Sequence, residues 1–183
     1  YHYIEPQHHK VFIDKMWLIG QAIHEKRYIE ITYERTKDRK LVNRKIQPQA
    51  ILFSEFYFYL VAHIDNIDKE KEFDEATDMF PTIYRMDRIR DLKVSEEHFS
   101  IQYKDHFEEG EYRKRIQFMY GGKLQRTKFW YKGTSVEAVL DRLPTAKIIK
   151  EEDGRFLITA ETFGKGIDMW LRSQGDYVEV IKK

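Results

Sequence analysis

Four short extended segments follow one another at close spacing in the first half of the chain, after a single amphipathic helix. Apolar residues recur at steps of three and four through VFIDKMWLIGQAIHEK, which predicts that helix. The extended segments are RYIEITYER, NRKIQPQAILF, FYFYLVAHI and TIYRMDRIRDLKV. Short strands this close together predict a small, strongly bent antiparallel sheet or barrel.

The third of these segments carries aromatic residues at four consecutive positions, 56–59. Side chains of a strand alternate between two faces. The face expected to enter the core holds Phe56, Phe58, Leu60, Ala62 and Ile64. The other face holds Tyr57, Tyr59, Val61 and His63. Its rings can stack and form hydrogen bonds, so it is either a recognition surface or a half-buried face whose hydroxyls contact water.

The fourth segment places arginines between aspartates, in the order Arg85, Asp87, Arg88, Arg90 and Asp91. One interpretation is a solvated face on which the arginines pair with the aspartates, which stabilises a fold only weakly. The other is recognition, because arginine beside aromatic strands suits a planar anion or a stacked base. Arg44, between the first two strands, adds a further candidate charge.

The last third of the chain predicts a second set of elements. RIQFMYG and RTKFWYKG are expected to be strands around a turn at Gly121-Gly122. TSVEAVLDRLP predicts a helix capped by Thr134 or Ser135, and GIDMWLRSQG predicts another. AKIIKEEDGRFLITAETF predicts a hairpin with Asp153-Gly154 at its turn, and DYVEVI a closing strand. The resulting order β-α-β-β-α-β predicts two helices on one face of an antiparallel sheet.

These patterns divide the chain into two domains of an α+β protein. Residues 1–11 are expected to be a linker or tail, and residues 12–104 the first domain. The charge switches from acidic to basic within residues 105–113, which we interpret as a connector. Residues 114–183 form the second domain.

A basic and aromatic stretch, YRKRIQFMYGGKLQRTKFWYK, opens the second domain with seven basic residues and no acidic one. Interleaved basic and aromatic side chains on strands are what single-stranded nucleic acid prefers. A sheet with an apolar face and a lysine-rich solvent face, which discourages edge pairing, explains the pattern equally well.

Composition restricts the classes of function. The 183 residues include no cysteine, which excludes disulfides and thiolate sites and agrees with a cytoplasmic protein. With 32 Lys and Arg against 31 Asp and Glu, the net charge of +1 does not indicate a nucleic-acid binder. No apolar run is long enough for a bilayer, and no signal peptide is visible, so no membrane partner is expected. A chain that begins with Tyr1 is expected to be a piece of a longer protein.

Catalytic signatures are missing from the sequence. It contains no phosphate-binding Walker loop, no dinucleotide glycine fingerprint, no G-x-S-x-G elbow and no H-E-x-x-H motif. The adjacent pair His8-His9 is better explained as solvated than as a metal site. We therefore expect no enzyme activity, no cofactor and no metal.

Four motifs in order, IEITY, NRKIQP, FYFYLVAH and YRMDRIRDL, resemble the WYL-domain transcriptional regulators. Phe58-Tyr59-Leu60 stands where the naming tripeptide stands, with Phe in place of Trp. The resemblance covers about residues 16–99, and residues 112–183 are similar to the extension that follows many WYL domains. It implies an Sm-like (SH3-like) small β-barrel with an N-terminal helix, followed by a ferredoxin-like βαββαβ extension.

The same resemblance implies a sensing role and a set of ligand-binding residues. The WYL barrel would bind a nucleotide or single-stranded nucleic acid and control an upstream helix-turn-helix domain, absent from this chain, that binds double-stranded DNA. Matched motif by motif, the site residues are Tyr33, Arg44, Tyr59, His63, Arg85 and Arg88.

Two other functions compete with this one. The two domains could be an oligomerisation scaffold, expected as a homodimer, that holds DNA-binding arms apart and senses nothing. That hypothesis predicts arginines fully paired with Asp87 and Asp91. An enzyme acting on nucleotides is the third hypothesis, and no catalytic constellation supports it.

Overall fold

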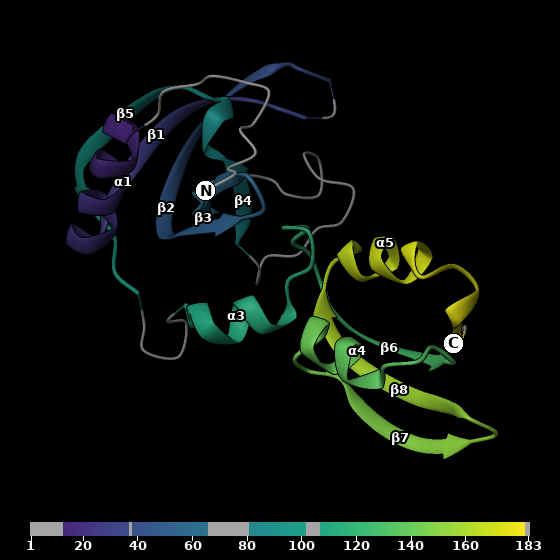
Figure 1. Cartoon of the computed structure of the whole chain (residues 1–183). Helices are drawn as coiled ribbons and strands as arrows, with labels where there is room; N and C mark the ends of the chain where they lie inside the picture. Colours follow the sequence, from purple (N-terminus) through teal and green to yellow (C-terminus); the bar gives the residue numbers. More distant parts are fainter. Residues whose placement is uncertain (1–12, 37, 66–80, 102–106, 182–183) are drawn as a thin grey trace, which may run out of the picture. The chain divides into compact units, whose positions relative to one another are not determined.

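A computed structural model describes residues 13–36, 38–65, 81–101 and 107–181 (Figure 1). The chain divides into two compact units, Tyr1–His106 and Phe107–Lys183. Each unit has its own sheet and its own hydrophobic core. The predicted tail, most of the polar segment after Asp65 and part of the predicted connector lie outside the described residues.

The first unit is a curved five-stranded antiparallel sheet with one long helix, α1 (Ile13–Glu25). Its strands are β1 (Arg27–Glu34), β2 (Leu41–Ser54), β3 (Tyr57–Ile64), β4 (Thr82–Arg85) and β5 (Ile89–His98), in the order β4-β3-β2-β1-β5. The prediction of a closed barrel is wrong for the described residues. β4 pairs with β3 and β5 pairs with β1, so the two strands remain the edges of an open sheet.

One face of this sheet packs against α1 and forms the core of the first unit. From α1, Ile19 and Ala22 are fully buried. The strands contribute the buried residues Ile29, Ile31, Tyr33, Ile46, Leu60, Ala62, Ile64, Tyr84 and Ile89. Alternation along β3 therefore holds for Leu60, Ala62 and Ile64. It fails for Phe56, which is 51% exposed in the two-residue turn between β2 and β3.

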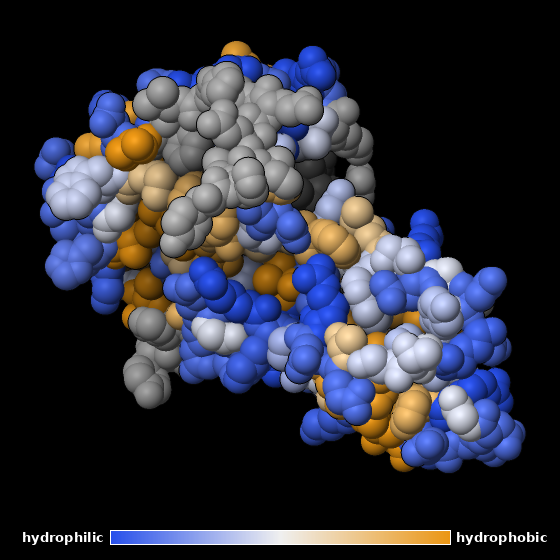
Figure 2. Space-filling view, in the orientation of Figure 1, coloured by the Kyte–Doolittle hydropathy of each residue, from blue (hydrophilic) through white to orange (hydrophobic). Residues whose placement is uncertain are grey.

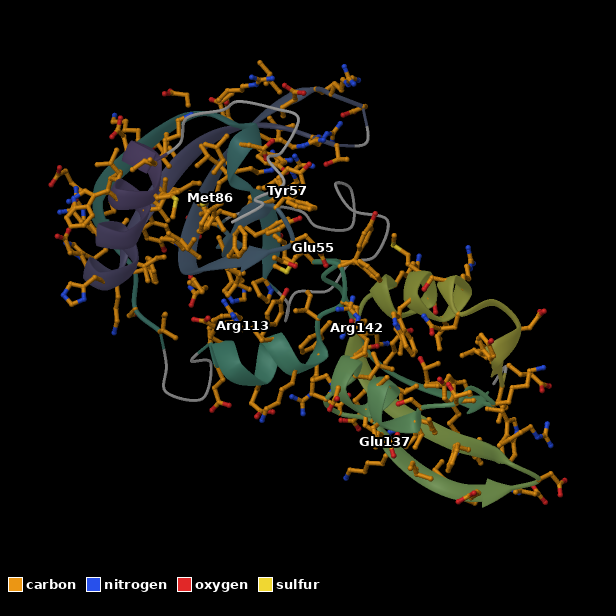
Figure 3. The ribbon with its side chains drawn as sticks, viewed as in Figure 1. Glu55, Tyr57, Met86, Arg113, Glu137 and Arg142 are labelled. Atoms are coloured by element: carbon orange, nitrogen blue, oxygen red, sulfur yellow. The ribbon has the colours of Figure 1, made fainter. Side chains whose placement is uncertain are left out.

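The fourth predicted segment is not one strand. A 3₁₀ turn, η1 (Met86–Arg88), separates β4 from β5. Met86 is buried in the core and holds this turn against the sheet; Figure 3 shows its position within the first unit. The backbone is extended again on both sides of the turn, at Arg85 and Ile89. Arg85 therefore precedes the turn, and Arg88 is its last residue.

The second unit contains the predicted β-α-β-β-α-β order. After α3 (Glu109–Arg115) come β6 (Leu124–Tyr131), α4 (Val136–Arg142), β7 (Lys147–Glu152), β8 (Arg155–Phe163), α5 (Gly166–Ser173), the 3₁₀ turn η3 (Gly175–Tyr177) and β9 (Val178–Val180). The strands pair antiparallel in the order β7-β8-β6-β9. Residues of β6, β8, α4 and α5 form the core, with Phe129, Leu143, Ile158 and Ile167 fully buried.

Local signals in this unit behave as expected. The Ser135 hydroxyl accepts a hydrogen bond from the backbone N–H of Ala138 at 3.3 Å and caps α4. Asp153 and Gly154 have φ of 50° and 69° at the turn between β7 and β8. Apolar surface is visible on this unit around α4 and β7 in Figure 2, and Ile148 and Ile149 of β7 are exposed.

The predicted strand RIQFMYG is wrong, and residues 109–115, most of them within the predicted connector at 105–113, are helical. Residues 109–115 form α3, because oppositely charged side chains one turn apart stabilise a helix. Arg113 pairs with Glu109 at 2.9 Å, and Arg115 pairs with Glu111 at 2.6 Å. Phe118 and Met119 then have positive φ, 50° and 55°, which strand geometry does not allow.

None of the helices in the described part of the chain has the length and apolar character that a membrane span requires.

Candidate functional site

Arg85 is the last residue of β4 and lies opposite Tyr59 of β3 in the strand register. Its Nε donates to Oδ1 of Asp87 at 3.0 Å, and its Nη2 donates to Oδ2 at 2.8 Å. The Asp87 side chain is 4% exposed and that of Arg85 is 25% exposed. Two parallel charge-assisted hydrogen bonds to a buried carboxylate fix the plane of the guanidinium group.

Tyr57 and Tyr59 lie beside this ion pair, on the same face of β3 because they are two residues apart. The guanidinium carbon of Arg85 lies 3.7 Å from the centroid of the Tyr57 ring. This is the distance of a stacked cation–π contact. The Tyr57 and Tyr59 rings meet edge to face, with centroids 6.4 Å apart. Tyr57 is labelled in Figure 3.

Burial raises the pKa of the Tyr59 hydroxyl above its usual value, and the charge of Arg85 opposes that rise. The hydroxyl is therefore protonated at neutral pH and can donate a hydrogen bond.

Tyr33 connects β1 to the same corner of the sheet. Its ring is 8% exposed and packs edge to face on Tyr84, with centroids 4.9 Å apart. Its hydroxyl accepts a hydrogen bond from the backbone N–H of Arg85 at 3.4 Å. Burial raises the pKa of Tyr33, while the Arg85 bond and the charge of Arg88 oppose the rise. Tyr33 is thus hydrogen-bonded to the backbone of Arg85.

Arg88, in η1, is held differently from Arg85. Its Nη1 donates to the Thr36 hydroxyl at 3.2 Å, which is a single bond to a neutral group. Its side chain remains partly exposed.

Arg44 and His63 lie on β2 and β3. Arg44 stands opposite Ile31 in the register, and its Nη1 donates to the backbone carbonyl of Asn43 at 3.0 Å. Burial raises the pKa of Tyr84, and the charge of Arg44 opposes that rise. His63 stands opposite Gln47, four positions along β3 from Tyr59, which is about 13 Å of strand.

Strand register and one hydrogen bond bring Tyr33, Tyr59 and Arg85 together at the corner formed by β1, β3 and β4. Arg88 lies in the adjacent turn η1 and reaches Thr36, three residues after Tyr33. Arg44 lies on β2, and His63 lies further along β3. Sequence reasoning did not assign Tyr57, Asp87 or Thr36 to a site. Tyr57 was on the correct face, but nothing in the sequence says which arginine stacks on it.

Ion pairing accounts for part of the arginine cluster. Asp87 pairs with Arg85, as the scaffold hypothesis predicts. Arg90 pairs with Glu34 of β1, across the sheet, and not with Asp91. The contact of Arg88 with Thr36 involves no carboxylate.

Most of the basic stretch at 112–132 is neutralised within the second unit. Four of its basic residues pair with carboxylates: Arg113 with Glu109, Lys114 and Arg115 with Glu111, and Arg126 with Glu161. Trp130 is flanked by Lys150 and Arg155, 5.0 and 4.8 Å from its ring. This stretch therefore carries much less uncompensated charge than its sequence suggests.

Comparison with known proteins finds a family model that matches part of the first unit. Residues 15–94, which are 80 of the 183 residues, match the sequence model of the WYL domain family. This part of the chain is therefore similar to a WYL domain. The match spans α1 to the middle of β5 and includes Tyr33, Arg44, Tyr59, His63, Arg85 and Arg88. No curated protein matches the chain.

Solved structures resemble the chain at low sequence identity. A CRISPR Cas-related protein is 16% identical with a TM-score of 0.55, over 94% of this chain and 48% of the other. Proteasome accessory factor B/C (PafBC) of Arthrobacter aurescens is 15% identical with a TM-score of 0.47, over 98% of this chain and 26% of the other. The chain thus spans about half and about a quarter of these two proteins. The likeness to the CRISPR Cas-related protein concerns the fold alone.

Proposed function

We propose that this chain is the ligand-sensing portion of a WYL-type transcriptional regulator. Its WYL domain binds an anionic ligand, either a nucleotide or single-stranded nucleic acid. The observation that carries the proposal is that Tyr33, Tyr59 and Arg85 meet at one corner of the WYL domain, with Arg88 in the adjacent turn bonded to Thr36. Cationic guanidinium groups beside partly exposed aromatic rings suit a ligand that has both phosphate and rings.

The site would act on DNA binding through the rest of the protein. Ligand binding changes the grip of an upstream helix-turn-helix domain, outside this chain, on double-stranded DNA. The regulator acts as a homodimer in the cytoplasm, and binding requires no catalysis and no cofactor. A ligand can shift the DNA-binding equilibrium only by its difference in affinity for the two states of the regulator.

We further propose that the two sheets are variants of an Sm-like and a ferredoxin-like fold. In the first unit, the support is the order β4-β3-β2-β1-β5 with a 3₁₀ turn between β4 and β5. In the second unit, it is the fully antiparallel order β7-β8-β6-β9 with one helix between β6 and β7 and another between β8 and β9.

A ligand-independent oligomerisation scaffold is the second candidate function. The Arg85–Asp87 ion pair favours it, because a paired arginine needs no ligand. This candidate predicts a dimer whose sedimentation is unchanged by nucleic acid.

Fluorescence anisotropy with a labelled single-stranded oligonucleotide distinguishes the two candidates. Sensing predicts saturable binding that weakens with salt, and that is reduced at least several-fold by Arg88→Ala and by Arg44→Ala. Arg113→Ala is the matched control, because Arg113 is an exposed, paired arginine of the second unit. Equal affinities of all three variants and the parent chain would show that the proposed site is wrong.

A further inference from the structure

Arg85 and Arg88, the two arginines at the corner of the WYL domain, differ in their existing contacts and therefore suit different parts of a ligand. This difference deepens the proposed function and rests on it. Arg85 makes a two-point ion pair with Asp87, at 3.0 and 2.8 Å. Arg88 makes one hydrogen bond, to the hydroxyl of Thr36 at 3.2 Å. Among the described residues, the charge of Arg85 is therefore compensated by a carboxylate, whereas the one hydrogen bond of Arg88 goes to a neutral hydroxyl.

Arg85 is poorly suited to bind phosphate. Its Nε edge, which otherwise makes the two-point contact with an anion, is occupied by the Asp87 carboxylate. A phosphate that approaches Arg85 also approaches that carboxylate, so repulsion offsets much of the attraction. What Arg85 offers is a flat surface, because one face of its guanidinium plane rests on the Tyr57 ring at 3.7 Å.

Guanidinium planes and aromatic rings both stack on nucleobases. Arg85 and Tyr57 already form a two-layer stack whose plane is fixed by Asp87, and a quarter of the Arg85 side chain remains exposed. A base that stacks there loses no binding energy to ordering the arginine, since the ion pair has ordered it already.

We propose that Arg85, stacked on Tyr57, is a platform for a nucleobase, that Arg88 binds a backbone phosphate, and that Asp87 is the positioning residue for Arg85. The ligand class is then a polynucleotide or nucleotide with an intact base. A sugar-phosphate without a base would contact Arg88 but would not stack on Arg85.

The test compares two fluorescein-labelled probes with the full chain over a series of salt concentrations. One probe is an oligothymidylate, and the other is an abasic oligonucleotide with the same number of phosphates. Arg88→Ala is expected to weaken both probes and to reduce the salt slope by about 0.7–1, the effect of one lost phosphate contact. Arg85→Ala combined with Asp87→Ala removes the whole ion pair and leaves no uncompensated carboxylate to repel phosphate. This double variant is expected to weaken the oligothymidylate by about 5- to 100-fold without changing the slope, and to leave the abasic probe unaffected.

Asp87 and a conservative change of Arg85 extend the test. Asp87→Asn removes the compensating charge, so Arg85 becomes available to phosphate and the salt slope is expected to increase. Arg85→Lys keeps the charge and loses the plane, and is expected to weaken only the oligothymidylate. It supplies the result if the double variant does not fold. Arg90→Ala, which removes a paired arginine that contacts Glu34, is the control.

The outcomes separate this inference from the proposed function. If the parent chain binds the oligothymidylate but the Arg85 variants weaken both probes equally, or lower the salt slope as Arg88→Ala does, the base platform is wrong and sensing stands. If the parent chain binds neither probe, the proposed function fails and the platform fails with it.

Discussion

Removal of Arg85 is expected to destabilise the first unit by more than any surface charge does. Arg85→Ala leaves the Asp87 carboxylate, 4% exposed, without its two-point partner. Breaking a fully buried ion pair costs about 3–5 kcal/mol, and a hydrogen bond to a charged group contributes about 1.5–3 kcal/mol. Because Arg85 is 25% exposed and water can partly replace it, we expect a loss of about 2–3 kcal/mol.

A double-mutant cycle isolates the pair. Asp87→Ala in the Arg85→Ala background removes the carboxylate that has lost this ion pair, so the double variant is expected to recover part of the loss, with a coupling energy of about 1–2 kcal/mol. Urea-dependent hydrogen exchange measures it, with amides of β3 and β4 reporting on the first unit. Amides of β6 and β8 report on the second unit and are an internal control.

The matched control is Arg90→Ala, which removes a cross-strand pair with Glu34. The Arg90 side chain is 50% exposed, so its loss is expected to cost less than about 1 kcal/mol. A coupling energy below about 0.5 kcal/mol for Arg85 and Asp87 would refute the view that this ion pair is a rigid element of the site.

Two substitutions and one pH titration test the local structure. Ser135→Ala removes the cap that accepts the Ala138 N–H, and is expected to lower the stability of the second unit by about 1 kcal/mol in urea denaturation. Lys26→Gly is expected to raise the stability of the first unit by about 0.5–1 kcal/mol, because Lys26 follows α1 with φ of 54°, a conformation that favours glycine; an unchanged midpoint would contradict this. Hydrogen bonds from Lys114 and Arg115 lower the pKa of Glu111 to about 2. Its stabilising contribution is therefore present above the unfolded pKa and lost as pH falls toward 2, and an NMR titration in which this carboxyl protonates at its usual pKa would refute the assignment.

Periodicity predicted the faces of β3 where the strand is regular and failed where the chain turns. Leu60, Ala62 and Ile64 face the core as expected. Phe56 does not, because Glu55 adopts φ of 56° and the two-residue turn takes Phe56 out of the strand alternation. Hydrophobic alternation contains no information on where a hairpin turns if the turn has neither glycine nor proline.

Charge patterns were the least reliable signal. The switch from acidic to basic residues near 109–115 is equally typical of a connector and of a helix with pairs one turn apart. It proved to be a helix, since Glu109 and Glu111 reach Arg113 and Arg115. The same ambiguity affected the arginine cluster, because the sequence places an aspartate next to Arg88 and another next to Arg90, whereas the ion pair forms between Asp87 and Arg85.

The sequence predicts the residues of the candidate site but not the contacts of its arginines, and the 3₁₀ turn η1 is the reason. In a continuous strand, Arg85 and Asp87 would share a face and Arg88 would lie on the opposite one. The turn instead brings the Asp87 carboxylate to the Nε edge of Arg85, and it brings Arg88 to Thr36 beyond the end of β1. Buried Met86 holds the turn in this position. Two arginines of similar sequence context therefore differ in their compensation, and this difference is what would let them recognise different parts of one ligand.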